Sequence, residues 1–154
     1  MNLDPSAFVA DSELLQALGR ESTPCACSQE RVLFRQGDAP AGLYIVKSGS
    51  ATLSMTTSAS TEILALEAGA GSLLGLPGLI GNGPYTLTAI AHAGSEIGYL
   101  ARENFTAVMR SDPLLALKIL QVLAAEVRSA RSAILEQSGT RKRGSRRLTH
   151  ARPA

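Results

Sequence analysis

The sequence predicts a mainly β fold with flanking helices (α+β), and three observations lead to this prediction. Short apolar runs recur at intervals of about ten residues between positions 30 and 100, and glycines separate them. This spacing is typical of a β-roll or sandwich. Helical patterns flank the strands on both sides. The expected architecture is a jelly roll, or double-stranded β-helix, with a short N-terminal helix and a long C-terminal dimerisation helix.

The N-terminal helix is predicted from its two ends. Asp11 or Ser12 caps it, because a short polar side chain accepts hydrogen bonds from the first free amides of a helix. An apolar run begins at Leu14, and Gly19 is expected to end the helix. Residues 22–28 read as a connector. Strands are then expected at 32–34, 43–48, 51–56, 61–66, 73–74, 87–92 and 96–100, within a roll of about 30–100.

Two helices are expected after position 100. A short one opens at 101–105, and its apolar face consists of Phe105, Val108 and Met109. The long helix begins at Pro113, because a capping residue followed by proline in the first turn is a strong start signal. It is expected to span 113–137 and to end at Ser138 and Gly139. At 25 residues it is about twice the mean helix length of roughly 11–12.

The long helix carries a heptad-like apolar series that we call the seam. The spacing of its members is 4-3-4-3-4, as at the a and d positions of a coiled coil. Other apolar residues flank the seam in the first half of the helix, so this half is expected to be buried on two sides. One side would cover the roll and the other would meet a second copy of the chain; alternatively, the helix packs only on its own domain. The seam consists of Ala116, Leu120, Leu123, Val127, Ala130 and Ile134.

Composition and charge divide the chain into an acidic body and a basic tail. The 154 residues, 45% of them hydrophobic, fit one domain, expected at 1–138. Six of the fifteen Lys and Arg residues lie in 139–154, where there is no Asp or Glu, so nine basic residues face thirteen acidic ones in the body. We expect 139–154 to be disordered, with weak, salt-dependent contact to nucleic acid as the alternative. No signal peptide and no membrane span are predicted, which suggests a cytoplasmic protein.

Candidate catalytic and metal-binding residues are few. Cys25 and Cys27 are too closely spaced for an easy disulfide and read as ordinary thiols. His92 lies in a predicted strand between alanines, without a carboxylate near it in sequence, and His150 lies in the tail. We therefore expect no enzyme activity, no metal site and no cofactor.

A motif at 37–49 resembles a known family. Glycine and aspartate are followed, after four intervening residues, by an apolar-aromatic-aliphatic-aliphatic run and then by a further glycine. The matching residues are Gly37, Asp38, Leu43, Tyr44, Ile45, Val46 and Gly49. This pattern is similar to the effector domain of the catabolite-activator/FNR regulators, which have the cyclic-nucleotide-binding fold. The resemblance implies a sensor and a homodimer formed through two parallel copies of the long helix.

The phosphate-binding cassette of that family has lost its charged residues here. The family has Gly-Glu before an aliphatic run and Arg-Ser/Thr-Ala several residues later, so that a guanidinium pairs with the phosphate and a glutamate with the ribose. Here Leu76 replaces the glutamate, Thr86 or Tyr85 replaces the arginine, and no charged residue lies between Glu67 and His92. We expect a pocket unsuited to cyclic AMP or cyclic GMP, which is either filled by its own side chains or open to a small, mostly apolar ligand. The candidate lining is Leu74, Gly75, Leu76, Gly78, Leu79, Tyr85, Thr86, Leu87 and Thr88.

These observations predict a stand-alone sensor domain that acts in signal transduction or transcription regulation through a protein partner. Regulators of this kind follow the long helix with a helix-turn-helix of about 70 residues, and only sixteen residues follow Ser138 here. Two alternatives stay open at this point. One is a nucleic-acid-associated protein that uses its basic tail, and the other is a cyclic-nucleotide-binding protein with an unusual cassette.

Overall fold

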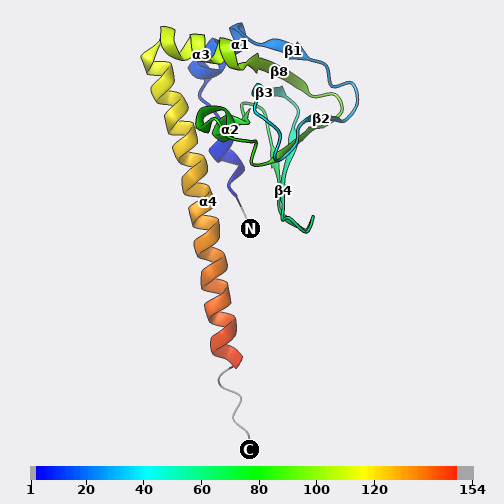
Figure 1. Cartoon of the computed structure of the whole chain (residues 1–154), viewed down its shortest axis with the longest axis vertical. Helices are drawn as coiled ribbons and strands as arrows, with labels where there is room; N and C mark the ends of the chain where they lie inside the picture. The colour runs from blue at the N-terminus through cyan, green and yellow to red at the C-terminus, as the bar shows by residue number, and fades with distance from the viewer. Residues whose placement is uncertain (1–2, 149–154) are drawn as a thin grey trace, which may run out of the picture.

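The structure, a computed structural model, describes the backbone of residues 3–148 and the side chains of residues 3–136. A β-roll is flanked by helices, and one long helix runs down its side and beyond it (Figure 1). The elements are η1 (Pro5–Phe8, a 3-10 turn), α1 (Ser12–Arg20), β1 (Thr23–Cys25), β2 (Arg31–Phe34), β3 (Gly42–Ser48), β4 (Ala51–Thr56), β5 (Glu62–Ala68), β6 (Leu73–Leu74), α2 (Leu76–Gly81), β7 (Thr88–Ala91), β8 (Glu96–Ala101), α3 (Arg102–Ser111) and α4 (Pro113–Leu148).

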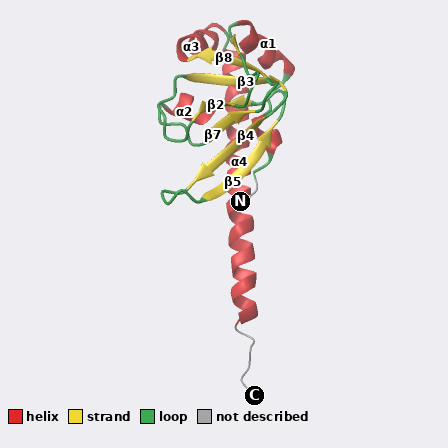
Figure 2. Cartoon of the chain, turned by 90° about the vertical axis from the view of Figure 1, so that its right-hand side faces the viewer, coloured by secondary structure: helices red, strands yellow, loops and turns green. Residues whose placement is uncertain are grey.

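The strands of residues 3–148 form two four-stranded antiparallel sheets, and this confirms the predicted jelly roll. Their orders are β1-β8-β3-β6 and β2-β7-β4-β5. Nearly every neighbour in these orders is distant in sequence, as crossing connections in a roll require; β4 and β5 are the exception. The strands cross the body one above the other in Figure 2. The seven predicted strands are all present, with ends within about two residues of expectation.

Alternation along the strands explains which residues form the core. In β4, Ala51 and Leu53 are buried while Thr52 and Ser54 between them are partly exposed. Successive side chains of a strand point to opposite faces, so one face of this sheet contributes to the core.

The connector expected at 22–28 contains a strand that the sequence did not reveal: β1 pairs with β8, with Cys25 opposite Ile97. Cys25 and Cys27 are both free thiols.

The short helices α1 and α3 begin where the sequence predicts, whereas η1 and α2 were not predicted. The Asp11 carboxylate accepts a hydrogen bond from the Leu14 amide at 2.8 Å and so caps α1. The helix continues past Gly19 to Arg20, because Gly19 is not in a left-handed conformation and does not terminate it. Lys118 of α4 donates to the carboxylates of Asp11 and Glu13, both at 2.7 Å, and thereby ties α1 to α4.

The long helix begins at Pro113 as predicted but ends later than expected. The Asp112 carboxylate accepts from the Leu114 amide at 3.0 Å at its start. The helix runs to Leu148, so Ser138 and Gly139 do not end it. Gly139 and Gly144 each cost only about 1 kcal/mol in a helix, and the four arginines among residues 140–148 are good helix formers. The backbone of 139–148 is described as helical and 149–154 lie outside the described residues, so the disorder expected for 139–154 stays a prediction.

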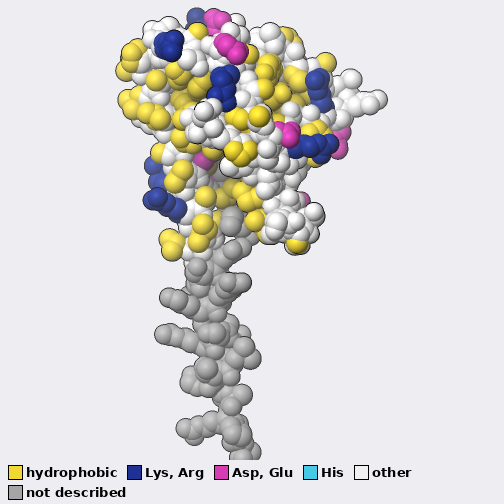
Figure 3. Space-filling view, viewed as in Figure 1, with side chains coloured by type: hydrophobic (Ala, Val, Ile, Leu, Met, Phe, Trp, Pro, Cys, Tyr) yellow, Lys and Arg dark blue, Asp and Glu magenta, His cyan; other side chains and the backbone are white. Residues whose placement is uncertain are grey.

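The face of α4 that meets the roll is a series offset by one residue from the seam. Its buried members are Leu115, Ile119, Val122, Glu126 and Ala133. The seam lies beside it: Leu120, Val127 and Ile134 are 53%, 44% and 52% exposed, and the other three members are half-buried. Apolar side chains gather over α4 and its junction with α3 on the face shown in Figure 3. No helix within residues 3–148 has the length and apolar character needed to cross a membrane.

Candidate functional site

The segment from β6 to the end of α2 depends on one glycine. Gly75 has φ of +95°, a left-handed conformation that favours glycine, and it turns the chain from β6 into α2. A Cβ at this position would also lie 2.8 Å from Tyr85 Cε1. Pro77 lies in the first turn of α2 and has no amide hydrogen to offer a ligand. At the other end of α2, Arg102 donates to Asn82 Oδ1 and to the Pro40 carbonyl, both at 2.8 Å.

Tyr85 fills the interior beside this segment. Its ring stacks on Phe34 with 4.0 Å between centroids and 18° between planes. Its hydroxyl donates to the Gly42 carbonyl at 2.7 Å and accepts from the Gly42 amide at 3.2 Å. Its backbone amide donates to the Asp38 carbonyl at 2.9 Å, and its carbonyl accepts from the Gly37 amide at 2.8 Å. Tyr85 occupies one of the two alternative positions of the cassette arginine, and it therefore builds core where an arginine would offer charge.

A small cavity of about 20 Å³ remains between the roll, the N-terminal turn and α4. A cavity of this volume holds about one water molecule. The N-terminal segment, drawn in blue in Figure 1, lies between α4 and the strands and closes this side. The described lining consists of Phe8, Phe34, Leu53, Leu74, Gly75, Pro77, Gly78, Tyr85, Thr86, Leu87 and Glu126.

Six of the nine expected lining residues meet at this cavity, and three do not. Leu76 and Leu79 belong to a second core cluster that packs against α1, α3 and α4. Thr88 lies in β7, and its hydroxyl accepts a hydrogen bond from the Gln36 amide at 3.0 Å. The six that line the cavity are Leu74, Gly75, Gly78, Tyr85, Thr86 and Leu87. Whether any of the nine binds a ligand stays a prediction.

The expected lining lacks five residues of this cavity, and Glu126 is the one carboxylic acid among them; the other four are Phe8, Phe34, Leu53 and Pro77. The side chain of Glu126 is only 9% exposed, and Oε1 has no hydrogen-bond partner among the described residues. Burial raises the pKa of this carboxyl to about 8, because the charged form loses its hydration. A signal was present in the sequence: Glu126 falls four residues after Val122 and seven before Ala133, on a stripe that is otherwise apolar.

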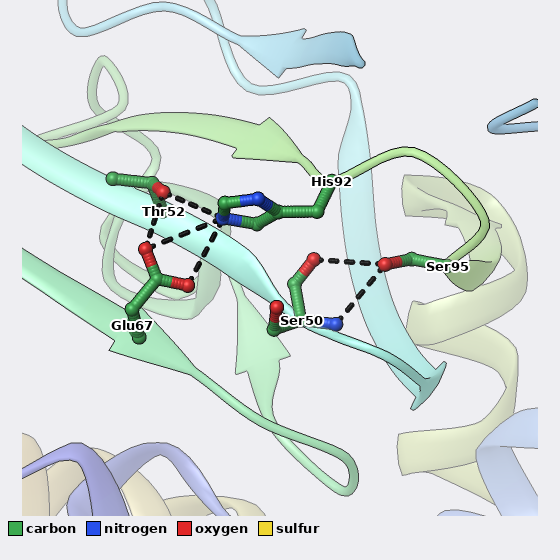
Figure 4. Close-up of polar contacts among 5 residues, drawn as sticks. All are labelled: Ser50, Thr52, Glu67, His92 and Ser95. Carbon is green, nitrogen blue, oxygen red and sulfur yellow. Dashed lines mark hydrogen bonds and ion pairs between the residues drawn. The ribbon is translucent and has the colours of Figure 1, made fainter. Parts of the chain in front are cut away.

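A polar cluster on the outer surface of the roll, shown in Figure 4, brings His92 to a carboxylate. His92 Nε2 lies 3.0 Å from Glu67 Oε2. No carboxylate is close to His92 in sequence, as noted above, but the fold brings the carboxylate of Glu67 next to it. The Thr52 hydroxyl donates to Glu67 Oε1 at 2.6 Å and lies 2.8 Å from the same Nε2. The Thr52 hydroxyl gives its one hydrogen to Glu67 and can therefore only accept from His92. The Nε2–H of His92 is thus the donor to both Thr52 and Glu67.

The geometry of this cluster differs from a nucleophile-base-carboxylate relay. In such a relay the carboxylate holds one ring nitrogen and the other accepts the nucleophile's proton. Here Glu67 and Thr52 share one nitrogen of His92. The cluster joins β4, β5 and the end of β7, and Ser95, whose hydroxyl bonds the backbone N–H and C=O of Ser50 at 3.0 Å each, closes the neighbouring turn (Figure 4).

Comparison with known proteins agrees with this architecture. The cyclic nucleotide-binding domain family matches residues 24–112, which include strands β2 to β8, the altered cassette and α3, and which end just before α4. The chain belongs to this family. It has the cyclic-nucleotide-binding fold and is related to a cyclic AMP receptor protein and to a catabolite activator protein.

Three relatives illustrate the likeness. The chain is 33% identical over 102 residues to a cyclic AMP receptor protein of Thermus thermophilus, across 66% of this chain and 47% of that protein. It superposes on the catabolite activator protein of Thermus thermophilus with a TM-score of 0.72 and 28% identity, over 88% of this chain and 63% of that one. It shares its fold with the N-terminal domain of a Streptomyces coelicolor transcriptional regulator (TM-score 0.61, 24% identity, 84% and 90% covered). The chain thus spans about half of its curated Thermus relative.

Proposed function

We propose that this chain is a sensor or regulatory domain that acts in signal transduction or transcription regulation through a partner, without binding cyclic AMP or cyclic GMP in the usual way of its family. The observation that carries the proposal is the cavity beneath α2. It measures about 20 Å³, whereas pockets for small molecules are about 300–1,000 Å³. The stacked rings of Phe34 and Tyr85 take up space that a nucleotide needs.

The charges at the cavity also oppose a cyclic phosphate. A buried phosphate needs a guanidinium or several backbone amides. The described lining contains no Lys or Arg, Pro77 lacks an amide hydrogen, and the carboxyl of Glu126 faces the cavity. The loss of one charge-assisted hydrogen bond costs about 1.5–3 kcal/mol, which is roughly ten- to a hundredfold in affinity. Burial raises the pKa of Glu126 to about 8, so above that pH repulsion from the ionised carboxyl would weaken binding of an anion further.

The output of the domain would run through α4. Glu126 places one side of this helix at the cavity, while the seam on the adjacent side carries exposed apolar residues, including Leu120 and Val127. A groove of about 340 Å³ between α2, α3 and α4 continues this apolar surface and includes Ala116 and Leu120. We propose that a second copy of the chain covers the seam, so that a change at the cavity alters how two copies pack.

A thermal-shift titration tests the ligand part of this proposal. A ligand at a hundredfold its dissociation constant adds about 2.7 kcal/mol to stability, or roughly 5–10 °C in Tm for a domain of this size. Cyclic AMP and cyclic GMP at millimolar concentration should leave Tm nearly unchanged. A saturable rise with either nucleotide would contradict the proposal and restore the alternative of a cyclic-nucleotide site with an unusual cassette.

A further inference from the structure

The cavity contains one carboxyl and no basic side chain to balance it. Of its eleven described lining residues, Glu126 is the one that belongs to the group Asp, Glu, Lys, Arg and His. Its side chain is nine-tenths buried, and Oε1 lacks a hydrogen-bond partner among the described residues. A buried carboxyl without a partner carries a large desolvation cost, which a proton or a cation can offset.

The remaining walls favour a cation. Three aromatic residues, Phe8, Phe34 and Tyr85, belong to the lining, and the rings of Phe34 and Tyr85 stack on each other. The face of an aromatic ring is negatively polarised and attracts ammonium groups, most strongly where water is excluded. An anion would find no positive side chain in the described lining and would meet Glu126. The lining therefore favours a cation, because it contains Glu126 and aromatic residues and because its described residues include no positively charged side chain.

The size of the cavity limits the ligand. A volume of about 20 Å³ accommodates one water-sized group, and a primary ammonium head has about this size. Thr86 lines the cavity and is itself exposed, so the cavity reaches the surface at this residue. A short alkyl chain attached to the head can extend toward that opening, whereas a bulky substituent cannot enter without displacing α4 or the N-terminal turn.

We propose that this cavity binds a small organic ammonium, whose nitrogen pairs with the Glu126 carboxylate and whose short alkyl part packs against the aromatic lining. The inference rests on the proposed sensor function and names the chemical class of the ligand. Such a ligand joins α4, through Glu126, to Phe34 and Tyr85 of the roll. Binding would thus strengthen the contact between the sensing body and the helix that carries the seam.

Proton release gives the proposal a specific signature. In the empty cavity the pKa of Glu126 is raised to about 8, so the carboxyl is neutral at pH 6–7. It must give up its proton to pair with an ammonium group. The dissociation constant should therefore fall about tenfold between pH 6 and 7 and less steeply as pH approaches 8, with close to one proton released per ligand at the lower pH.

Calorimetric titration with ethylammonium chloride is the test. Methylammonium and propylammonium chloride form a size series, and ethanol and sodium acetate at equal ionic strength are the neutral and anionic controls. A ligand of three heavy atoms binds no tighter than about millimolar, so ligand is titrated to several hundred millimolar. Two buffers of different ionisation enthalpy report the released proton. Glu126→Gln should weaken ethylammonium binding at least tenfold, while Glu136→Gln, an exposed position on the same helix, should not.

Several results would overturn the inference. These are no saturable binding of any ammonium, equal binding of ethanol, affinity independent of pH, or unchanged affinity in Glu126→Gln; the cavity then holds a water molecule or a proton only. Because the pH dependence is read on the unaltered chain, the test survives if the variant folds poorly. A parallel titration with cyclic AMP tests the proposed function separately from this inference. Binding of cyclic AMP would contradict the proposed function, whereas absence of ammonium binding alone would contradict only this inference.

Discussion

Replacing Glu126 by glutamine should change how the stability of the domain depends on pH. The folded chain holds the pKa of this carboxyl at about 8, because its side chain is buried between α4 and the roll, while the ordinary value is 4.5. Between these two values the folded state binds one more proton than the unfolded state. The free energy of unfolding of the parent must therefore fall as pH rises, and the loss is complete once pH exceeds the folded-state pKa.

The interval between the two pKa values sets the magnitude. Each pH unit corresponds to about 1.4 kcal/mol, so the interval from 4.5 to about 8 amounts to a loss of up to about 5 kcal/mol. Glutamine has nearly the same shape and no proton to lose. The difference in stability between Glu126→Gln and the parent should thus grow in favour of the variant from pH 5 to pH 8 and level off above pH 8.

Urea denaturation at pH 5, 6, 7, 8 and 9 measures this difference. Tyr85 is the other ionisable residue of the described cavity lining, and Asp4 and Arg128 lie in the adjoining surface hollow. These groups are common to both proteins, so their titration cancels in the comparison. Glu136→Gln is the matched control on the same helix and should follow the parent. Parallel curves for the parent and Glu126→Gln would refute the reasoning, since they would mean that the carboxyl is hydrated or paired.

Three further predictions follow from the described contacts. Val127→Glu places like charges across a two-fold apolar seam, so sedimentation should show a dimer for the parent and a monomer, or aggregate, for the variant; a monomeric parent at tens of micromolar would exclude the seam as an interface. Tyr85→Phe removes two buried hydrogen bonds and should cost about 1–3 kcal/mol in urea denaturation, whereas Tyr99→Phe, which removes one exposed bond, should cost less. Truncation after Ser138 should leave Tm unchanged, because the last buried side chain described on α4 is Ala133, and it should abolish any salt-sensitive binding of nucleic acid; specific DNA binding by the truncated chain would contradict this.

Local signals predicted the elements of the fold well. Alternation of apolar residues located the strands, and the Asp11 cap and Pro113 located two helix starts. Local signals failed at two expected helix ends and at one short strand. Gly19 and Gly139 read as helix ends, but a glycine ends a helix only where the chain turns away, and at these positions it continues. The strand β1 was missed because three residues, with little alternation, depend on pairing with β8.

The candidate site was predictable only in part. The altered cassette and six residues of the cavity follow from the uncharged segment between Glu67 and His92, since they lie together in the sequence. Phe8 and Glu126 lie at opposite ends of the chain and reach the cavity only because η1 and α4 pack against each other. The pairing of His92 with Glu67 likewise depends on two sheet neighbours that are 25 residues apart.

The sequence by itself determined the roll, the flanking helices and the absence of the cassette's glutamate and arginine, because strand alternation, caps and residue identity are local properties. Only the tertiary structure decided which stripe of α4 faces inward. Two apolar series one residue apart differ by about 100° around a helix, and both could cover the roll. The series with Leu115, Ile119 and Val122 packs inward and carries Glu126 to the cavity, while the seam stays at the surface. Burial then raises the pKa of the Glu126 carboxyl to about 8. Burial is a property of the folded chain and cannot be read from the order of the residues alone.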